Sequence, residues 1–264
     1  MDELIPSYLL KMERAEKHLK DLKIAIAEYA SSHPYTVTVG REGKRQVHRL
    51  HFTSQLDRRV SLIAADFVYN IRSGLDHLAA ELNPPRYRTK TMFPILWEGV
   101  WEPEVPGENE QRTRDRAKWL TTTRHMNPEA VAILKTLQPH VFEDLNLDIF
   151  FLDAFNRLSN KDRHSHLPLI VSGLRNAFVT CTQADGSTGR LVDDRNGVVK
   201  DNASIPVPKG AVNVKIKGTP AVIIRIAEPK GFVEIPSFFE ERLETVRRRV
   251  VIPLSPFVWV DPKK

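Results

Sequence analysis

The first thirty residues carry a regular alternation of apolar and polar positions. Apolar side chains recur at alternating spacings of four and three, while Lys and Glu occupy the other faces, and this period is typical of an amphipathic helix. The apolar seam over residues 5–30 consists of Tyr8, Met12, Ala15, Leu19, Leu22, Ile26 and Tyr29. Because so narrow a seam packs against only one or two helices, we expect a long helix that pairs within the chain or forms a homodimer surface.

A second long helix is predicted from about Leu56 to Leu82. Ser54 is a plausible N-cap for it, and Asn83 followed by two prolines would stop it. Its apolar stripe comprises Val60, Ala64, Phe67, Ile71, Leu75, Leu78 and Leu82. We expect this stripe to face the core.

The remaining pattern changes character near residue 166. Two alternating runs at 35–39 and 46–52, with glycines between them, predict a β-hairpin. Further helices are expected at 110–120, 127–137 and 145–162, and a last one at 237–250. Strand-like runs follow residue 166 at 167–171, 177–182, 212–217, 221–227 and 232–235. The predicted fold class is α+β: a helical domain over 1–166 with the hairpin at 35–52, then a β-rich region with a terminal helix over 167–264, either separate or packed as one.

Composition narrows the possible functions only slightly. Among the 264 residues Cys181 is the single cysteine, so the chain cannot form an internal disulfide. This favours a reducing, cytoplasmic location, and no run approaches the roughly 20 apolar residues that cross a bilayer. A net charge of +6 mildly favours an anionic partner such as RNA, but the excess is scattered apart from Arg247–Arg249.

The second long helix carries an unusual polar face. Asp66, Asn70, Ser73 and His77 recur at helical spacing, whereas solvated faces are usually built from Lys and Glu. Arg72 lies on another side, one turn before Asp76. One interpretation is a functional site around His77. The other is a structural polar seam, in which Asn70 and His77 bond a neighbouring helix and Gly74 allows close approach.

A second polar group closes the helix predicted at 145–162. Asn156, Asn160 and His164 share one face, although a solvated helix end would look similar. If a metal such as zinc or iron is bound, Asp162, His164 and His166 with His77 are the candidate ligands. No His-Glu-x-x-His pair and no cysteine pair supports that site. Glycine-rich phosphate loops and the Gly-x-Ser-x-Gly elbow are absent too, so no cofactor is implied.

Four short segments resemble a known group of sequences. NIRSGLDHLA, FPI at 93–95, LQPH at 137–140 and LSNKDRH at 158–164 look like a group of uncharacterised bacterial proteins with the same landmarks in the same order. RSGLDH also resembles the Arg-x4-His signature of the HEPN superfamily, helical bundles that include metal-independent RNA endonucleases. The chain departs from that pattern at Ser73, where nuclease members have Asn, Asp or His. In the uncharacterised group, Asp-Lys-His-Arg stands where this chain has Asp162-Arg163-His164, and a Tyr stands where it has His140.

Three functions follow as hypotheses. The resemblance implies an RNA endonuclease, in which His77 exchanges the proton and Arg72 braces the phosphate. Five residues separate them by about 140° around the helix, so one site would combine two helices or two protomers, with Asn70, Asp76 and His164 as helpers. The alternatives are a non-catalytic binding or regulatory protein with a structural polar seam, and a metal-dependent hydrolase using His77, His164 and Asp162.

Overall fold

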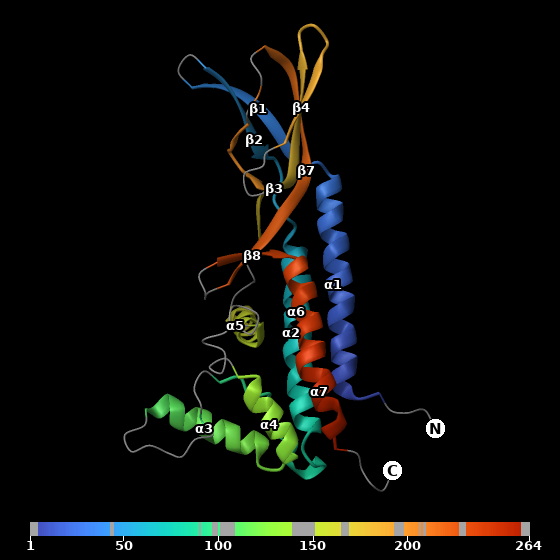
Figure 1. The fold of residues 1–264 in the computed structure, drawn as a ribbon, viewed down its shortest axis with the longest axis vertical. Helices are drawn as coiled ribbons and strands as arrows, with labels where there is room; N and C mark the ends of the chain where they lie inside the picture. The colour runs from blue at the N-terminus through green and yellow to red at the C-terminus, as the bar shows by residue number, and fades with distance from the viewer. Residues whose placement is uncertain are drawn as a thin grey trace. The chain divides into compact units, whose positions relative to one another are not determined.

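The protein has an α+β fold with antiparallel sheets, as the sequence predicts (Figure 1). The computed structural model describes residues 5–42, 45–89, 91–96, 100, 109–138, 151–164, 169–192, 198–205, 207, 210–226 and 231–259. The chain forms two compact units. Unit 1 comprises Met1–Leu19, Ala64–His166 and Phe239–Lys264, and unit 2 comprises Lys20–Ile63 and Leu167–Phe238.

These units differ from a single boundary at residue 166, for two reasons of packing. The hairpin β1 (Tyr35–Glu42) and β2 (Arg45–Phe52) belongs to unit 2, because β2 pairs with β6 (Ser204–Ile205). Most of the terminal helix α6 (Ser237–Val246) belongs to unit 1, because Phe239 stacks on Phe67 of α2 with 4.5 Å between ring centroids. Both contacts join segments more than 150 residues apart in the sequence, and local pattern does not report such pairings.

Helices supply the core of unit 1. They are α1 (Ser7–Ser31) and α2 (Arg58–Glu81), which also extend into unit 2, with η1 (Pro85–Tyr87), α3 (Glu110–Thr123), α4 (Pro128–Thr136), α5 (Phe151–His164), α6, η3 (Arg247–Val251), α7 (Ile252–Leu254) and η4 (Ser255–Phe257). Every residue of the predicted α2 stripe is buried. Phe67 lies at its centre, fully buried between Phe239 and Phe155 of α5, whose ring centroid is 6.0 Å away. This aromatic cluster ties three helices together.

The close approach of α1 to α2 depends on Gly74. A Cβ atom at this position would lie 2.6 Å from the Cε of Met12 and 3.2 Å from the Cβ of Lys11. Met12 is buried, so the predicted seam of α1 does face a helix of the same chain. The absence of a side chain at Gly74 therefore explains why a glycine, which costs about 1 kcal/mol within a helix, is placed here.

Helix starts follow the sequence signals with one exception. Asn127 caps α4, with its side chain accepting from the Glu129 N–H, and Asn109 caps α3 by accepting from the Arg112 N–H. The prediction of Ser54 as the cap of α2 is wrong. Asp57 accepts from the backbone N–H of Arg59 at 2.8 Å, and this hydrogen bond lowers the pKa of the Asp57 carboxyl. The helix consequently starts two residues later than predicted.

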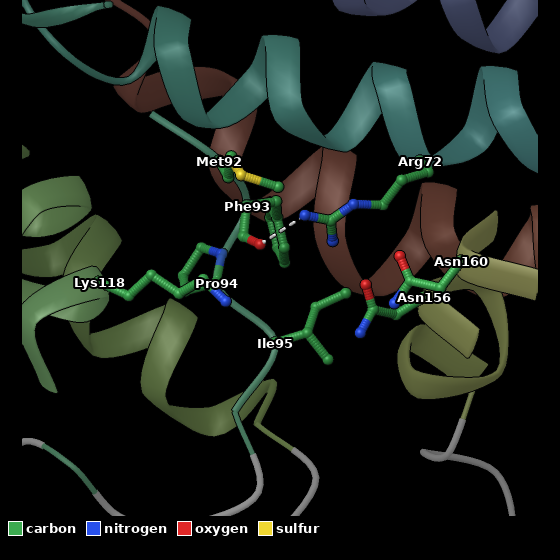
Figure 2. Close-up of a pocket in the computed structure, with 8 residues that line it drawn as sticks. All are labelled: Arg72, Met92, Phe93, Pro94, Ile95, Lys118, Asn156 and Asn160. Atoms are coloured by element: carbon green, nitrogen blue, oxygen red, sulfur yellow. Dashed lines mark hydrogen bonds between the residues drawn. The ribbon is translucent and has the colours of Figure 1, made fainter. Parts of the chain in front are cut away.

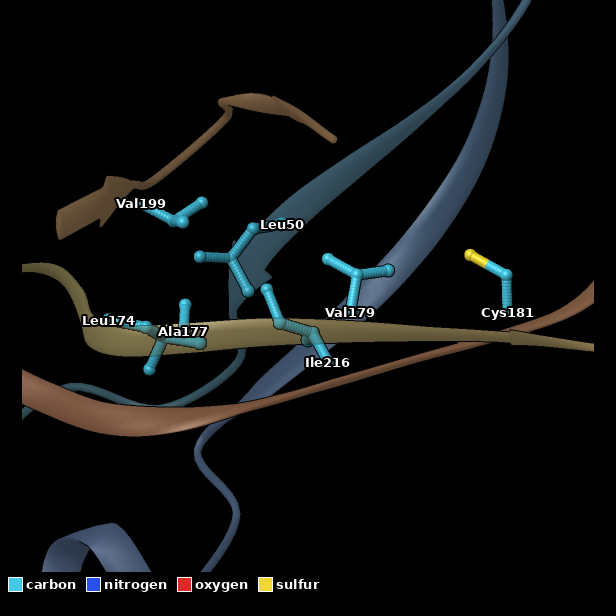
Figure 3. Packing of buried hydrophobic residues seen from close by; sticks show 7 residues of the cluster. All are labelled: Leu50, Leu174, Ala177, Val179, Cys181, Val199 and Ile216. Carbon is cyan, nitrogen blue, oxygen red and sulfur yellow. The ribbon is translucent and has the colours of Figure 1, made fainter. Parts of the chain in front are cut away.

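Unit 2 contains two sheets, ordered β1-β2-β6 and β4-β3-β7-β8. The pairs of runs predicted after residue 166 merge into the long antiparallel strands β3 (Leu169–Gln183) and β7 (Ala211–Ile226), whose register shifts at irregularities. The shorter strands are β4 (Thr188–Val192), β5 (Val198–Lys200), which pairs with β3, and β8 (Gly231–Ile235). Figure 3 shows the hydrophobic core of unit 2, which is formed by Leu50, Leu174, Ala177, Val179, Cys181, Val199 and Ile216.

None of the helices that the structure describes has the length and apolar character needed to span a membrane.

Candidate functional site

The site of greatest interest is built on Arg72 of α2. Its side chain is buried, with 5% exposed, and its Nη2 donates to the carbonyl oxygen of Phe93 at 3.1 Å. The same nitrogen lies 2.8 Å from Oδ1 of Asp76, one helical turn later. Asp76 in turn accepts from the backbone N–H of Phe93 at 2.9 Å. The ion pair therefore forms hydrogen bonds with both the carbonyl and the N–H of Phe93, which lies in the segment that follows η1.

Gln138, just after α4, holds the same segment from its other end. The buried amide accepts from the N–H of Leu96 at 2.9 Å and donates to the carbonyl of Pro94 at 3.1 Å. It also donates to the carbonyl of Leu134 in α4 at 2.8 Å. Residues 93–96 are thus fixed between α2 and the end of α4, and three of the four sequence landmarks meet here as a structural network.

The fourth landmark completes a small cavity beside this network. The cavity measures about 140 Å³ and is lined by Arg72, Met92, Phe93, Pro94, Ile95, Lys118, Asn156 and Asn160. Figure 2 shows the Arg72 guanidinium extending from α2, the amides of Asn156 and Asn160 facing it from α5, and Lys118 reaching in from α3. Every polar side chain of the lining is a cation or an amide. Such a lining suits a ligand that carries hydrogen-bond acceptors and negative charge.

His77 takes part in a separate polar group at the start of α1. Its Nδ1 lies 2.8 Å from the Oγ of Ser7, and that hydroxyl donates to the Glu81 carboxylate. Glu81 also accepts from the Ser7 backbone N–H at 3.1 Å. Because the hydroxyl proton is directed to Glu81, the Ser7 oxygen accepts from Nδ1–H, and this tautomer leaves the lone pair on Nε2.

The Ser7 group has a structural role as well. The first N–H groups of a helix lack partners within it, and the helix dipole favours a negative charge there. Glu81, at the end of α2, supplies both a partner and the charge. Burial, followed by the charge of Glu81, raises the pKa of Tyr8. The arrangement fixes the start of α1 against the end of α2.

The structure does not bring Arg72 and His77 together within one chain. Arg72 contacts the segment after η1, whereas His77 contacts α1, as expected for side chains about 140° apart on one helix. Asp76 is in the Arg72 network. Asn70 is buried and donates to the carbonyl of Asp66 in its own helix at 2.8 Å. This hydrogen bond joins it neither to the Arg72 network nor to the polar group of His77.

The remaining predicted residues are placed only in part. His164 is the last residue of α5 and Asp162 lies one half-turn before it, but their side chains are outside the described residues. His166 lies outside the described residues altogether. In the part of the chain that the structure describes, no three His, Cys, Asp or Glu side chains gather as a metal site would require. The proposed ligand set therefore stays a prediction.

Asn156 and Asn160, which the sequence places on one helix face, both line the cavity. Other residues of the two polar groups were not predicted. Lys118 and Met92 carry no such spacing signal, because they reach the cavity from separate segments. Ser7 and Glu81 lie 70 and 74 residues from their partners, and no local motif links positions so distant.

No family model, no curated protein and no solved structure matches the chain.

Proposed function

We propose that the protein is a binding protein for a small anionic ligand, held in the cavity between α2, α3 and α5. The observation that carries the proposal is the lining of that cavity: a buried arginine on one wall, two asparagine amides on the opposite wall and a lysine from a third helix. Arg72 is oriented by the backbone of Phe93 before any ligand arrives. Such pre-organisation reduces the entropy that binding must overcome.

The cavity limits the size of the ligand. A dry cavity of about 150 Å³ is large enough to hold benzene, so about 140 Å³ accommodates a molecule of about six non-hydrogen atoms. Phe93, Pro94 and Ile95 provide apolar surface for its body, while the amides and cations surround its charged end. A short carboxylate or a small phosphate fits both requirements.

The charge balance also favours an anion. Asp76 offsets the charge of Arg72 but is not part of the cavity lining. Lys118 then contributes the net positive charge that faces the ligand, from an exposed position on α3. We infer that Arg72 and the asparagines orient the ligand by hydrogen bonds and that Lys118 supplies the attraction.

Replacing Lys118 should weaken binding without unfolding the protein. We expect acetate and inorganic phosphate to bind saturably, and Lys118→Ala to raise the Kd about tenfold, because a hydrogen bond to a charged group contributes about 1.5–3 kcal/mol. Asn160 is also exposed, and Asn160→Ala should raise the Kd by about threefold or more. Isothermal titration calorimetry measures the affinity, and the side-chain amide NMR signals of Asn156 and Asn160 report where the probe binds.

Lys17→Ala is the matched control, since Lys17 is an exposed lysine on α1 outside the cavity lining. It should leave the affinity unchanged. Absence of saturable binding of both probes, or equal losses in Lys17→Ala and Lys118→Ala, would contradict the proposal.

A second candidate function, metal-independent RNA cleavage, is supported by the position of His77. The ring is half-buried rather than sealed, and Ser7 holds it in the tautomer whose Nε2 accepts a proton. A general base of this kind needs a fixed orientation and access to its substrate; the Ser7 contact supports the first and the half-buried position of the ring supports the second. The buried and paired state of Arg72 favours the ligand-binding function, since it leaves the phosphate-bracing role to a residue of another protomer.

RNA cleavage in EDTA tests this second candidate. If this second function holds, the wild-type chain cuts single-stranded RNA without metal, and His77→Ala reduces the rate about 10²–10⁴-fold, the usual contribution of general acid–base catalysis. His18→Ala, which removes another half-buried histidine from α1, should keep full activity. If the wild type leaves RNA intact, or if His77→Ala cuts at the wild-type rate, this function is excluded.

A further inference from the structure

A stacked group of three side chains connects η1 with the residues that follow α3. The ring of Tyr87 lies parallel to that of His125, with 3.5 Å between centroids and 10° between planes. The guanidinium of Arg86 lies 4.7 Å from the centroid of the same Tyr87 ring. Since a parallel ring at 3.5 Å fills one face of Tyr87, the guanidinium occupies the other. We call the ordered stack Arg86–Tyr87–His125 the stacking column.

Hydrogen bonds of Asn83 and Arg88 hold the backbone that carries the column. Asn83, which is buried, donates to the carbonyl of Ala79 in α2 and to that of Thr122 in α3, each at 3.0 Å. These bonds fix η1, which carries Tyr87, relative to the end of α3, which leads to His125. Arg88 reinforces the turn by donating to the Asn83 carbonyl at 3.1 Å.

Among the described residues, the positive charge around the column has no carboxylate partner. Arg86 and Arg124 are both exposed, and neither pairs with a carboxylate within the described part of the chain. The basic cluster singled out in the sequence differs, because Arg247 pairs with Glu16 and Arg248 with Glu244. Partial loss of hydration lowers the pKa of His125, and the positive charges of Arg124 and Arg86 lower it further.

We propose that the stacking column is a binding site for nucleotide chemistry, in which a base extends the stack and a phosphate lies between Arg86 and Arg124. A base has a π-face that stacks on an aromatic ring or a guanidinium, and arginine is suited to phosphate. The exposed guanidinium of Arg86 at one end of the column offers such a face. The column shares no residue with the lining of the Arg72 cavity and does not rest on the function proposed for it.

Binding of adenosine 5′-monophosphate and of a fluorescent single-stranded oligoadenylate tests this site in the full chain. We expect both to bind saturably, by NMR and fluorescence anisotropy respectively. Arg86→Ala, Arg124→Ala and Tyr87→Leu should each weaken binding about tenfold, because stacking and phosphate contacts act together. The phosphate should also raise the pKa of His125 in an NMR titration, because it offsets the two arginine charges; a purely structural stack would not produce this change.

Arg114→Ala is the matched control, since it removes an exposed arginine of α3 that pairs with Glu110 instead. It should change the affinity by less than about twofold. A duplex of the same sequence hides its base faces and should compete poorly. If the oligonucleotide binds much more tightly than the monophosphate, the occupant is a single strand; equal affinity indicates a free nucleotide.

Three results would overturn the proposal: no saturable binding of either probe, equal losses in Arg114→Ala and the column variants, or duplex binding as tight as that of the single strand. Circular dichroism checks the fold of each variant. If Tyr87→Leu unfolds, the exposed Arg86 and Arg124 variants decide the outcome.

Discussion

Asp76→Ala should lower the free energy of unfolding by about 3 kcal/mol, since removing one partner of a buried ion pair is strongly destabilising. Arg72 is almost fully buried and would lose its carboxylate partner. The backbone N–H of Phe93 would lose its acceptor at the same time. The segment over residues 93–96 would then loosen, and ligand binding in the adjacent cavity should weaken with it. Urea denaturation followed by circular dichroism measures the loss of stability.

Asp66→Ala provides the comparison for this variant. Asp66 is an exposed aspartate on the same helix, and its removal should change stability by no more than about 0.5 kcal/mol. Asp76→Asn keeps an acceptor for the Phe93 N–H but removes the charge, so it should fall between the two. Equal stabilities of Asp76→Ala and Asp66→Ala would show that the Arg72 network contributes little to the fold.

Phe67→Ala should lower the free energy of unfolding by about 3–5 kcal/mol. The ring is fully buried and contacts both Phe239 and Phe155, so its removal leaves a cavity at the junction of α2, α5 and α6. Since α5 carries Asn156 and Asn160, the ligand cavity should lose one wall as this helix shifts. The midpoint of urea unfolding reports the stability change.

Tyr69→Ala serves as the control for this substitution, because Tyr69 lies two residues later and is 55% exposed. Its contact with the Lys11 ammonium, 5.5 Å from the ring centroid, should contribute less than about 1 kcal/mol. A similar loss in both variants would mean that the aromatic cluster does not organise the helices as described.

The polar side chains of α2 belong to two separate hydrogen-bond networks. Arg72 and Asp76 fix the backbone of Phe93, which shapes the cavity, while His77 and Glu81 meet Ser7 at the start of α1. The structural interpretation of the polar face is confirmed at His77, which bonds a neighbouring helix, and at Gly74, which allows its close approach, whereas Asn70 bonds its own helix. The functional site around His77 stays a prediction. A single nuclease centre within one chain is not formed by these residues.

The sequence by itself determined what depends on local periodicity. The buried stripe of α2, the hairpin, the cap at Asn127 and the α+β class follow from helix and strand periods and from side chains that cap their own helix. The joint position of Asn156 and Asn160 was also readable, since four residues bring them to one face.

Only the tertiary structure decided which distant segments share a sheet, a core or a site. The pairing of β2 with β6, the stacking of Phe67 on Phe239 and the meeting of Ser7 with His77 each join positions at least 70 residues apart. Gln138 and Lys118 likewise gained their roles from the segment they reach. Such contacts are selected by the complementary shape and hydrogen bonding of whole elements, and a local pattern of residues carries no record of its distant partner.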